Sequence, residues 1–382
     1  MKILFFMDVY IFGGCEKMLK DIAEYLLAQG HQVDLLLIYK SESNTYLNQL
    51  DPRIRVRYIW NVDRCQNIVK RAVFWLNVCV PSIAASRVPA DGYDWVINFK
   101  DDYQTNMIAS KFNAKKISWI HNITEDYRPI TRKGLKFWIA DFLYRKINNK
   151  YLSSFSAFDR VVCVSLHAQS TLQSHCRKPI KTTVLYNYVD PHKIEGLAKE
   201  TISDVAFRDF TYCYVGRLSA EKGVTELMEA FCSLVNKGRQ AQLLIIGEGY
   251  QLDELKMLAE KYKCSDRIWF LGTKENPYPY IAHSDVVLCG SRKESFGLVV
   301  LEAILLNRWV VSTCCGGPEE LIIDGHNGFL VQNYRELSEK MEYLYLNRER
   351  KTENIEREKY LNLQNEFYSG LNALLNSEET SI

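Results

Sequence analysis

Short apolar runs alternate with amphipathic helical patterns along most of the chain. The runs in its first half are KILFFMDV, VDLLLIY, DWVINF, KISWIH, RVVCVS and TTVLYN. Runs of this length predict buried strands, and their alternation with helices predicts a parallel sheet with crossover helices. Between the first two runs, residues 16–29 carry one apolar stripe that ends at Gly30, which predicts a helix.

A second series of the same kind begins with FTYCYVGRL, residues 210–218, and continues with AQLLIIGEG, IWFLGT, DVVLCGS, NRWVVST and NGFLV. Two such series predict an α/β protein with two Rossmann-like, doubly wound domains. Residues 190–209 carry charge without apolar periodicity, and we place a hinge there. We therefore predict a first domain over residues 1–189 and a second over residues 210–358. The helical tail, residues 359–382, is predicted to pack back on the first domain.

Composition narrows the class of protein. The chain has 382 residues, of which 47% are hydrophobic and 25% charged, as is usual for a globular protein of two domains. Its formal net charge is only +2, so no overall positive field favours a nucleic-acid partner. The 11 cysteines are scattered, and none has the spacing of a zinc site. They indicate a reduced, cytoplasmic protein in which most cysteines act as small core residues.

Neither the N-terminus nor the longest apolar region predicts a membrane anchor. The first residues, MKILFFMDVYIFGG, run into a glycine turn without a small-residue cleavage pattern, which favours a strand over a signal peptide. The longest apolar region, residues 72–85, is broken by Pro81 and is shorter than the about 20 residues of a spanning helix. We therefore expect no transmembrane segment.

Two cations follow the first strand of the second series. In YVGRLSAEKG, residues 214–223, Arg217 and Lys222 lie between the end of a strand and the start of a helix. Cations at the carboxyl end of a parallel strand suit a diphosphate, because they neutralise its charge. The alternative is two solvated surface cations. A helix starting near Gly297 and Leu298 favours the diphosphate, because its free N–H groups can hold phosphate oxygens.

The segment KESFGLVVLEA, residues 293–303, carries two glutamates. In one continuous helix, Glu294 and Glu302 would lie roughly 80° apart and would share no face. We therefore expect Glu294 in a loop, a helix that begins near Phe296 and Gly297, and Glu302 on the buried side of that helix.

Two features of the first domain could face a substrate. FGGCEKML, residues 12–19, places Gly13 and Gly14 at a strand-to-helix turn, where the backbone could approach a phosphate or sugar, although a plain tight turn is the alternative. It lacks the G-x-G-x-x-G spacing of a nicotinamide site. His121 ends an apolar strand and either contacts substrate or forms a hydrogen bond with a neighbouring residue.

In the second series, residues 247–255, GEGYQLDEL, predict a further structural turn. The chain has no Asp-x-Asp motif, which disfavours a carboxylate-bound divalent metal.

Three motifs together resemble one enzyme family. They are GG-x-E at residues 13–16, GR…EKG at residues 216–223 and E-S-F-G-L-V-V-L-E at residues 294–302. The set resembles the retaining GT-B glycosyltransferases of family four (glycosyl transferases group 1), in which the two-glutamate motif is characteristic. The resemblance covers most of the second domain and, more loosely, the first. It implies a GT-B fold, with two Rossmann-like domains and a cleft between them.

The resemblance also implies a role for each charged residue of the motifs. Arg217 and Lys222 would bind the donor diphosphate and stabilise the departing nucleoside diphosphate without a metal. Glu302 would accept hydrogen bonds from the ribose hydroxyls. Glu294 would lie against the donor hexose.

Backbone groups and the first domain complete the site that the resemblance implies. The N–H groups around Phe296, Gly297 and Leu298 would meet phosphate and sugar. Gly14 would let the first domain's loop close over the diphosphate, and His121 would contact the transferred sugar.

The implied activity is transfer of a hexose or N-acetylhexosamine from a nucleotide diphosphate sugar, a UDP-sugar by preference. The configuration at the anomeric carbon would be retained, and no cofactor or metal would be needed. The acceptor would be a saccharide or a lipid-linked molecule in the synthesis of bacterial surface polysaccharide, such as capsule or lipopolysaccharide. Two alternatives are a non-catalytic GT-B partner subunit and a GT-B sugar-nucleotide epimerase. The intact motif residues disfavour the first, and the second would need further acid–base groups.

Two amphipathic segments could lie on a membrane surface. Residues 131–152 carry an aromatic and aliphatic stripe, and the cations beside it are Arg132, Lys133, Lys136, Arg145, Lys146 and Lys150. A basic, aromatic helix can bind an anionic membrane, although an ordinary core-facing helix is the alternative. Residues 64–78 form a second candidate with the same alternative. The predicted location is the cytoplasm, with peripheral contact to the inner face of the cell membrane.

Overall fold

The computed structural model describes residues 1–11, 13–40, 44–61, 67–87, 92–121, 135–176, 178–207, 209–348 and 357–376; the side chains of residues 67, 68, 70, 71 and 135–140 fall outside this description. The chain divides into two compact units. Unit 1 comprises Met1–Leu185 with Leu374–Ile382, and unit 2 comprises Tyr186–Ala373.

Unit 1 is built on a seven-stranded sheet whose strand order is β3-β2-β1-β4-β5-β6-β7, and the paired strands are parallel. The strands are β1 (Lys2–Met7), β2 (Gln32–Tyr39), β3 (Arg55–Trp60), β4 (Trp95–Asn98), β5 (Lys115–Ile120), β6 (Arg160–Cys163) and β7 (Thr182–Val184). The helices are α1 (Gly14–Ala28), α2 (Asn67–Cys79), α3 (Pro81–Ser86), α4 (Tyr103–Ala109), α5 (Leu135–Ser154) and α6 (Leu166–His175), with short 3-10 turns at Leu47–Gln49 and Phe155–Ala157. The strand order reverses between β1 and β4, the doubly wound arrangement that the sequence predicts.

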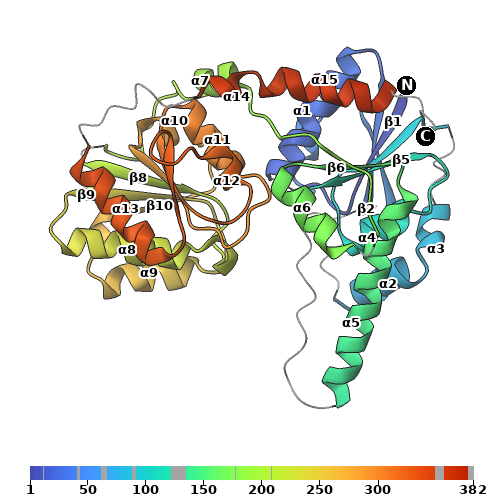
Figure 1. The fold of residues 1–382 in the computed structure, drawn as a ribbon, viewed down its shortest axis with the longest axis horizontal. Helices are drawn as coiled ribbons and strands as arrows, with labels where there is room; N and C mark the ends of the chain where they lie inside the picture. The colour runs from blue at the N-terminus through green and yellow to red at the C-terminus, as the bar shows by residue number, and fades with distance from the viewer. Residues whose placement is uncertain are drawn as a thin grey trace. The chain divides into compact units, whose positions relative to one another are not determined.

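Unit 2 repeats this plan with six parallel strands in the order β10-β9-β8-β11-β12-β13. The strands are β8 (Phe210–Val215), β9 (Ala241–Ile246), β10 (Ile268–Gly272), β11 (Val286–Cys289), β12 (Trp309–Thr313) and β13 (Gly328–Val331). The helices are α7 (Pro191–Leu197), α8 (Val224–Asn236), α9 (Leu252–Lys261), α10 (Tyr278–His283), α11 (Leu298–Leu305), α12 (Pro318–Leu321), α13 (Tyr334–Leu346) and α14 (Glu358–Leu361), with 3-10 turns η3 (Ala220–Lys222) and η4 (Ser265–Arg267). Figure 1 shows α8, α9 and α13 on one side of this sheet and α10 and α11 on the other. The order reverses between β8 and β11.

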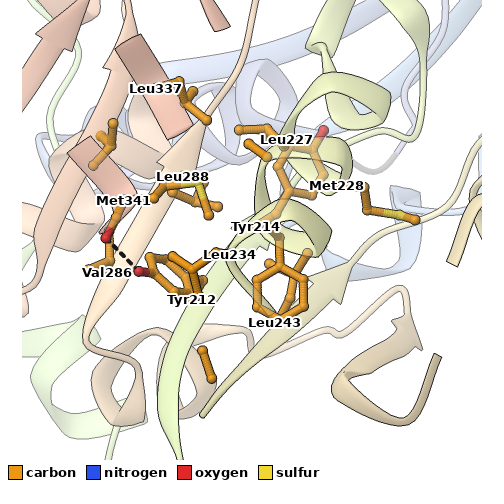
Figure 2. Close-up of a cluster of buried hydrophobic side chains, with 14 of the residues drawn as sticks. Tyr212, Tyr214, Leu227, Met228, Leu234, Leu243, Val286, Leu288, Leu337 and Met341 are labelled. Atoms are coloured by element: carbon orange, nitrogen blue, oxygen red, sulfur yellow. Dashed lines mark hydrogen bonds between the residues drawn. The ribbon is translucent and has the colours of Figure 1, made fainter. Parts of the chain in front are cut away.

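The core of unit 2 lies between its sheet and the layer of α8 and α13 (Figure 2). Tyr212 of β8 is fully buried, and its hydroxyl donates to the carbonyl oxygen of Met341 at 2.7 Å. Apolar side chains from α8, including Leu227 and Met228, pack in the same cluster. A buried tyrosine needs such a partner for its hydroxyl, so this bond ties the sheet to α13.

The segment predicted as a hinge, residues 190–209, lies within unit 2 and begins with helix α7. The side chain of Asp190 caps this helix by accepting from the N–H of Lys193 at 3.0 Å, and Ile194 is buried. Helix α7 is too short to show an apolar repeat in the sequence. The charged residues around it therefore did not predict a helix. The division between the units falls earlier, after Leu185.

The predicted C-terminal tail contains α14 and α15 (Leu363–Asn376), and residues 377–382 lie outside the described part of the chain. Residues from Leu374 onward group with unit 1. There the indole N–H of Trp95 donates to the carbonyl oxygen of Leu375 at 3.1 Å.

One pair of cysteines departs from the expected reduced chain. Cys232 on α8 and Cys264 after α9 form a disulfide, whereas eight other cysteines are unpaired in the described residues. The two helices pack against each other and bring together cysteines 32 residues apart in sequence. A separation of 32 residues does not indicate from the sequence that these two cysteines form a disulfide. Within the described residues, no helix combines the length and apolar character that crossing a membrane requires.

Candidate functional site

The loop after β8 carries the first predicted cations, Arg217 and Lys222. Arg217 is exposed, and its guanidinium pairs with Glu221 at 2.9 Å. Lys222 ends η3 and is followed by Gly223, whose φ is 62°. A Cβ at Gly223 would lie 2.1 Å from the carbonyl oxygen of Gly290, so only glycine lets this loop approach the end of β11 so closely.

This close approach brings Lys222 to Glu294. The ammonium nitrogen of Lys222 lies 2.6 Å from Oε2 of Glu294, and both side chains are partly buried, with 22% and 25% exposed. The hydroxyl of Ser291 also donates to Oε2 of Glu294, at 3.3 Å. The structure thus joins two residues from different motifs at the point where the strand order reverses, which is where open α/β sheets bind ligands.

Glu294 itself is held by the loop that follows β12. Its N–H donates to the carbonyl oxygen of Cys315 at 2.7 Å, and its carbonyl oxygen accepts from the N–H of Gly317 at 2.7 Å. A Cβ at Gly317 would lie 2.3 Å from the Cα of Phe296. The predicted loop position of Glu294 is therefore correct, and the neighbouring glycine-rich loop fixes it.

The helix predicted after Glu294 begins at Leu298, as α11. Gly297 precedes it with φ 93°, and no described side chain caps the helix, so the first N–H groups of α11 can bind an anion. Phe296 is buried, which leaves its backbone alone to meet a ligand. Glu302 lies in the helix and is largely buried, as predicted; its Oε1 accepts from the hydroxyl of Tyr278 at 3.1 Å.

A second glycine turn, which the sequence indicated only as structural, supports the Arg217 loop. Leu218 donates its N–H to the carbonyl oxygen of Glu248 at 2.9 Å, and a Cβ at Gly249 would lie 2.1 Å from the carbonyl oxygen of Leu218. The hydroxyl of Tyr250 accepts from the N–H of Ala220 at 3.0 Å. In the sequence, only the two glycines after the strand, Gly247 and Gly249, indicated a turn that could support the Arg217 loop.

In unit 1, the glycine turn leads into α1. Gly14 is the first residue of α1, and Gly13 precedes it in an extended conformation with no capping bond from a described side chain. A Cβ at Gly13 would lie 2.6 Å from Oε2 of Glu16. Gly13 therefore leaves room for the carboxylate of Glu16, the glutamate of the same motif.

His121 follows β5 at the same edge of the unit 1 sheet. Its backbone N–H donates to Oδ1 of Asp101 at 3.0 Å, and its ring centre lies 4.5 Å from that of Phe99. Burial and, to a smaller extent, the charge of the nearby Lys100 together lower its pKa to about 3, so the ring is neutral at neutral pH. Its Nε2 is buried and makes no hydrogen bond with the described residues.

The predicted site residues divide between the two units. Gly14 and His121 belong to unit 1, and the other seven belong to unit 2. Across the described chain, no three histidine, cysteine, aspartate or glutamate side chains are placed to hold a metal ion together.

Two family descriptions match the chain. Residues 12–193 match "Glycosyltransferase Family 4" and residues 200–360 match "Glycosyl transferases group 1". A solved structure, that of HepE from Anabaena in complex with UDP and glucose, superposes with a TM-score of 0.74 at 20% identity and covers 99% of this chain and 100% of that one. This likeness confirms the predicted GT-B fold class.

Curated relatives carry related names. The chain is 30% identical over 165 residues to the N-acetylgalactosamine-N,N'-diacetylbacillosaminyl-diphospho-undecaprenol 4-alpha-N-acetylgalactosaminyltransferase of Campylobacter jejuni, which covers 43% of this chain and 44% of that protein. It is 26% identical over 255 residues to the capsular polysaccharide biosynthesis glycosyltransferase CapM of Staphylococcus aureus, with coverages of 63% and 64%. The chain thus matches less than two thirds of either relative. Because the two family matches together span nearly all of it, the chain belongs to glycosyltransferase family four and has the GT-B architecture.

Proposed function

We propose that this protein is a retaining glycosyltransferase that moves a hexose or N-acetylhexosamine from a UDP-sugar to a saccharide or lipid-linked acceptor. The contact of Lys222 with Glu294 at the switch point of the unit 2 sheet carries the proposal. In the roles we propose, Lys222 binds the diphosphate and Glu294 binds sugar hydroxyls, and the contact between the two side chains supports this pairing. The HepE complex with UDP and glucose supports the choice of donor.

The chemistry proposed for this site is charge stabilisation. The bond between the anomeric carbon and the donor phosphate breaks, and the acceptor oxygen bonds to that carbon from the same face. The acceptor proton passes to the leaving phosphate, so no side chain is assigned as a general base. Arg217 and Lys222 stabilise the charge that develops on the nucleoside diphosphate, and for this reason we propose that no metal or other cofactor is required.

The remaining residues position the donor. Glu302 accepts hydrogen bonds from the ribose, and its bond from Tyr278 fixes the direction of its carboxylate. The N–H groups of Phe296, Gly297 and Leu298 bind phosphate oxygens at the uncapped start of α11. Gly14 contributes backbone contacts to the donor diphosphate, and His121 contacts the transferred sugar.

The proposed setting is the synthesis of a bacterial surface polysaccharide at the inner face of the cell membrane. The names of the Campylobacter and Staphylococcus relatives support it. Helix α5 supports the membrane contact, because Phe142, Leu143 and Tyr144 are exposed next to Arg145 and Lys146. Arg132 and Lys133, as well as the side chain of Lys136, lie outside the described residues.

Lys150 contributes less to a membrane surface, and the second amphipathic segment is described only in part. The ammonium of Lys150 donates to the carbonyl oxygen of Val78 at 2.7 Å and therefore joins α5 to α2. In residues 64–78, Trp75 is exposed, at 43%, whereas residues 64–66 are not described.

Product analysis tests the proposal against its alternatives. The protein is incubated with a UDP-sugar, with and without an acceptor, and the products are read by NMR. A glycoside that forms only with acceptor, in the anomeric configuration of the donor, is the expected result. An inverted glycoside would exclude retention, and conversion of the donor sugar without acceptor would indicate the epimerase.

A further inference from the structure

Three charged side chains meet where the strand order of the unit 1 sheet reverses. Asp8 follows β1, Lys100 follows β4, and Glu16 lies in the first turn of α1. The ammonium of Lys100 lies 2.9 Å from Oδ1 of Asp8 and 3.9 Å from Oε1 of Glu16. Both carboxylates are buried, with 5% and 4% of the residue exposed. One lysine thus balances two buried acids beside the glycine turn.

The carboxylate of Glu16 lies against the glycine turn. The backbone N–H groups of Ile11, before the turn, and of Glu16 itself lower the pKa of this carboxylate. The same carboxylate fills the space next to Gly13 that a Cβ would need. The hydroxyl of Tyr10 donates to the carbonyl oxygen of Glu16 at 3.0 Å. The conformation of the turn therefore depends on this side chain.

The Glu16 carboxylate brings negative charge next to the turn that is proposed to bind the donor diphosphate. Burial raises the pKa of Glu16, the charge of Asp8 raises it further, and Lys100 opposes both effects. Without Lys100, the buried carboxylate of Glu16 would lose the cation beside it, and its field would repel a phosphate at the start of α1.

We propose that Lys100 is a positioning residue of the transfer reaction. It neutralises Glu16 and Asp8, so that Glu16 can hold the Gly13–Gly14 turn in shape while the turn accepts the donor diphosphate. Lys100 acts through these carboxylates rather than on the reacting atoms. The part of this inference that concerns donor binding rests on the proposed function. The part that concerns the conformation of the turn does not.

The donor arm of the test is a charge-matched set of variants: Lys100→Met, Glu16→Gln, the double variant and Lys100→Arg. Lys100→Met is expected to raise the KM for the UDP-sugar about tenfold. The double variant is expected to return to within about threefold of Glu16→Gln, because one uncompensated acid has been removed, and Lys100→Arg to retain the wild-type KM. A double variant as impaired as Lys100→Met, or worse, would overturn the proposal. The Lys20→Met variant breaks an exposed ion pair with Glu24 on the same helix and is the matched control.

The turn arm needs no donor. In protein with isotope-labelled glycine, Lys100→Met is expected to shift the amide signals of Gly13 and Gly14, and Lys20→Met to leave them in place. Unmoved signals in Lys100→Met would contradict the proposal whether or not the protein turns over a donor. A wild-type protein that transfers no sugar would contradict the proposed function alone, and this arm would still decide the role of Lys100. If Lys100→Met does not fold, the double variant and Lys100→Arg carry both arms.

Discussion

A lysine ammonium carries three donor hydrogens, and Lys222 needs only one of them for Glu294. The others can meet phosphate oxygens, so the 2.6 Å contact can persist when a donor binds. Arg217 is placed differently, because its guanidinium is exposed and pairs with Glu221 on its own loop. In its proposed role, Arg217 leaves this exposed pair, which contributes little energy, to bind the donor diphosphate.

Arg217 and Glu302 are expected to affect different kinetic constants. Arg217→Gln should lower kcat about 100-fold with a small effect on UDP affinity, because its charge acts on the leaving group. Glu302→Gln should instead raise the Kd for UDP about tenfold, because a charged hydrogen bond to the ribose is lost. Calorimetric titration with UDP and steady-state kinetics separate the two effects. Equal behaviour of both variants would refute the assignment, and Arg335→Gln, in an exposed pair on α13, is the control.

His121 should make unit 1 less stable in acid. Its folded pKa is about 3, below the usual value of about 6.5, so between these pH values the unfolded chain binds a proton that the folded chain does not. Its contribution to the free energy of unfolding should therefore fall as pH decreases from 6.5 to 3, by at most about 1.4 kcal/mol per pH unit. Urea unfolding of wild type and His121→Asn measures this. Parallel pH profiles for the two proteins would show that His121 does not titrate in this way.

At the scale of elements, four loops of unit 2 interlock at the carboxyl ends of its strands. The loop after β8 hydrogen-bonds to the turn after β9, and the loop after β11 hydrogen-bonds to the one after β12. Glycines stand at the closest approaches, where a side chain would meet backbone atoms. These contacts keep Lys222 and Glu294 in register more than either loop could alone.

Gly317→Ala is expected to damage this arrangement, whereas Gly196→Ala is not. The new Cβ at position 317 would lie 2.3 Å from the Cα of Phe296. A Cβ added at position 196 would have no atom within 4 Å beyond the neighbouring backbone of its own helix. Gly317→Ala should lower the free energy of unfolding by about 1–3 kcal/mol and weaken donor binding. Gly196→Ala, in helix α7, should be neutral or slightly stabilising. Similar denaturant midpoints for both variants would contradict the interlocking of the loops.

The sequence predicted strongly periodic elements and missed features that depend on neighbours in space. The apolar stripe of residues 16–29 corresponds to α1, Gly14–Ala28, because periodicity is a local property. Helix α7 escaped prediction because a single turn or two carries too little repeat. The pairing of Cys232 with Cys264, and the support of the Arg217 loop by residues 247–251, require knowing which elements pack together.

The same limit applies to the candidate site. Motifs predicted Lys222 and Glu294 separately, but their contact spans 72 residues of sequence and follows from β8 and β11 being neighbours in the sheet. Lys100 was not predicted, because its partners lie far from it in sequence and its own segment, NFKDDY, matches no motif considered. A lysine directly after a buried strand was the available signal.

Across the whole molecule, both sheets place charged residues where their strand order reverses. In unit 1 these are Asp8 and Lys100, beside β1 and β4, and in unit 2 they are Lys222 and Glu294, beside β8 and β11. The carboxyl ends at such a switch point leave an opening that helices do not fill. The two sequence series with the same alternation therefore predicted both folds. They also predicted the sheet edges that carry the proposed site residues.

Membrane contact through α5 predicts a loss of binding when its cations are removed. Arg145→Gln/Lys146→Gln should weaken binding to anionic vesicles about tenfold or more, because each cation near the surface contributes about 1 kcal/mol. The matched control is Arg335→Gln/Lys340→Gln, which removes a similar pair of cations from α13. Co-sedimentation with vesicles measures both. Equal sedimentation of the α5 variant and wild type would refute the contact.

Binding of a nucleotide sugar is the central claim, and ligand-observed NMR tests it most directly. The purified protein is measured against a panel of UDP-, GDP- and ADP-sugars, with slow hydrolysis of each donor recorded in the absence of acceptor. We expect one UDP-sugar to bind selectively, to be displaced by UDP, and to bind weakly to Glu302→Gln. Failure of every nucleotide sugar to bind would contradict the account and make the non-catalytic GT-B partner the better explanation of the fold.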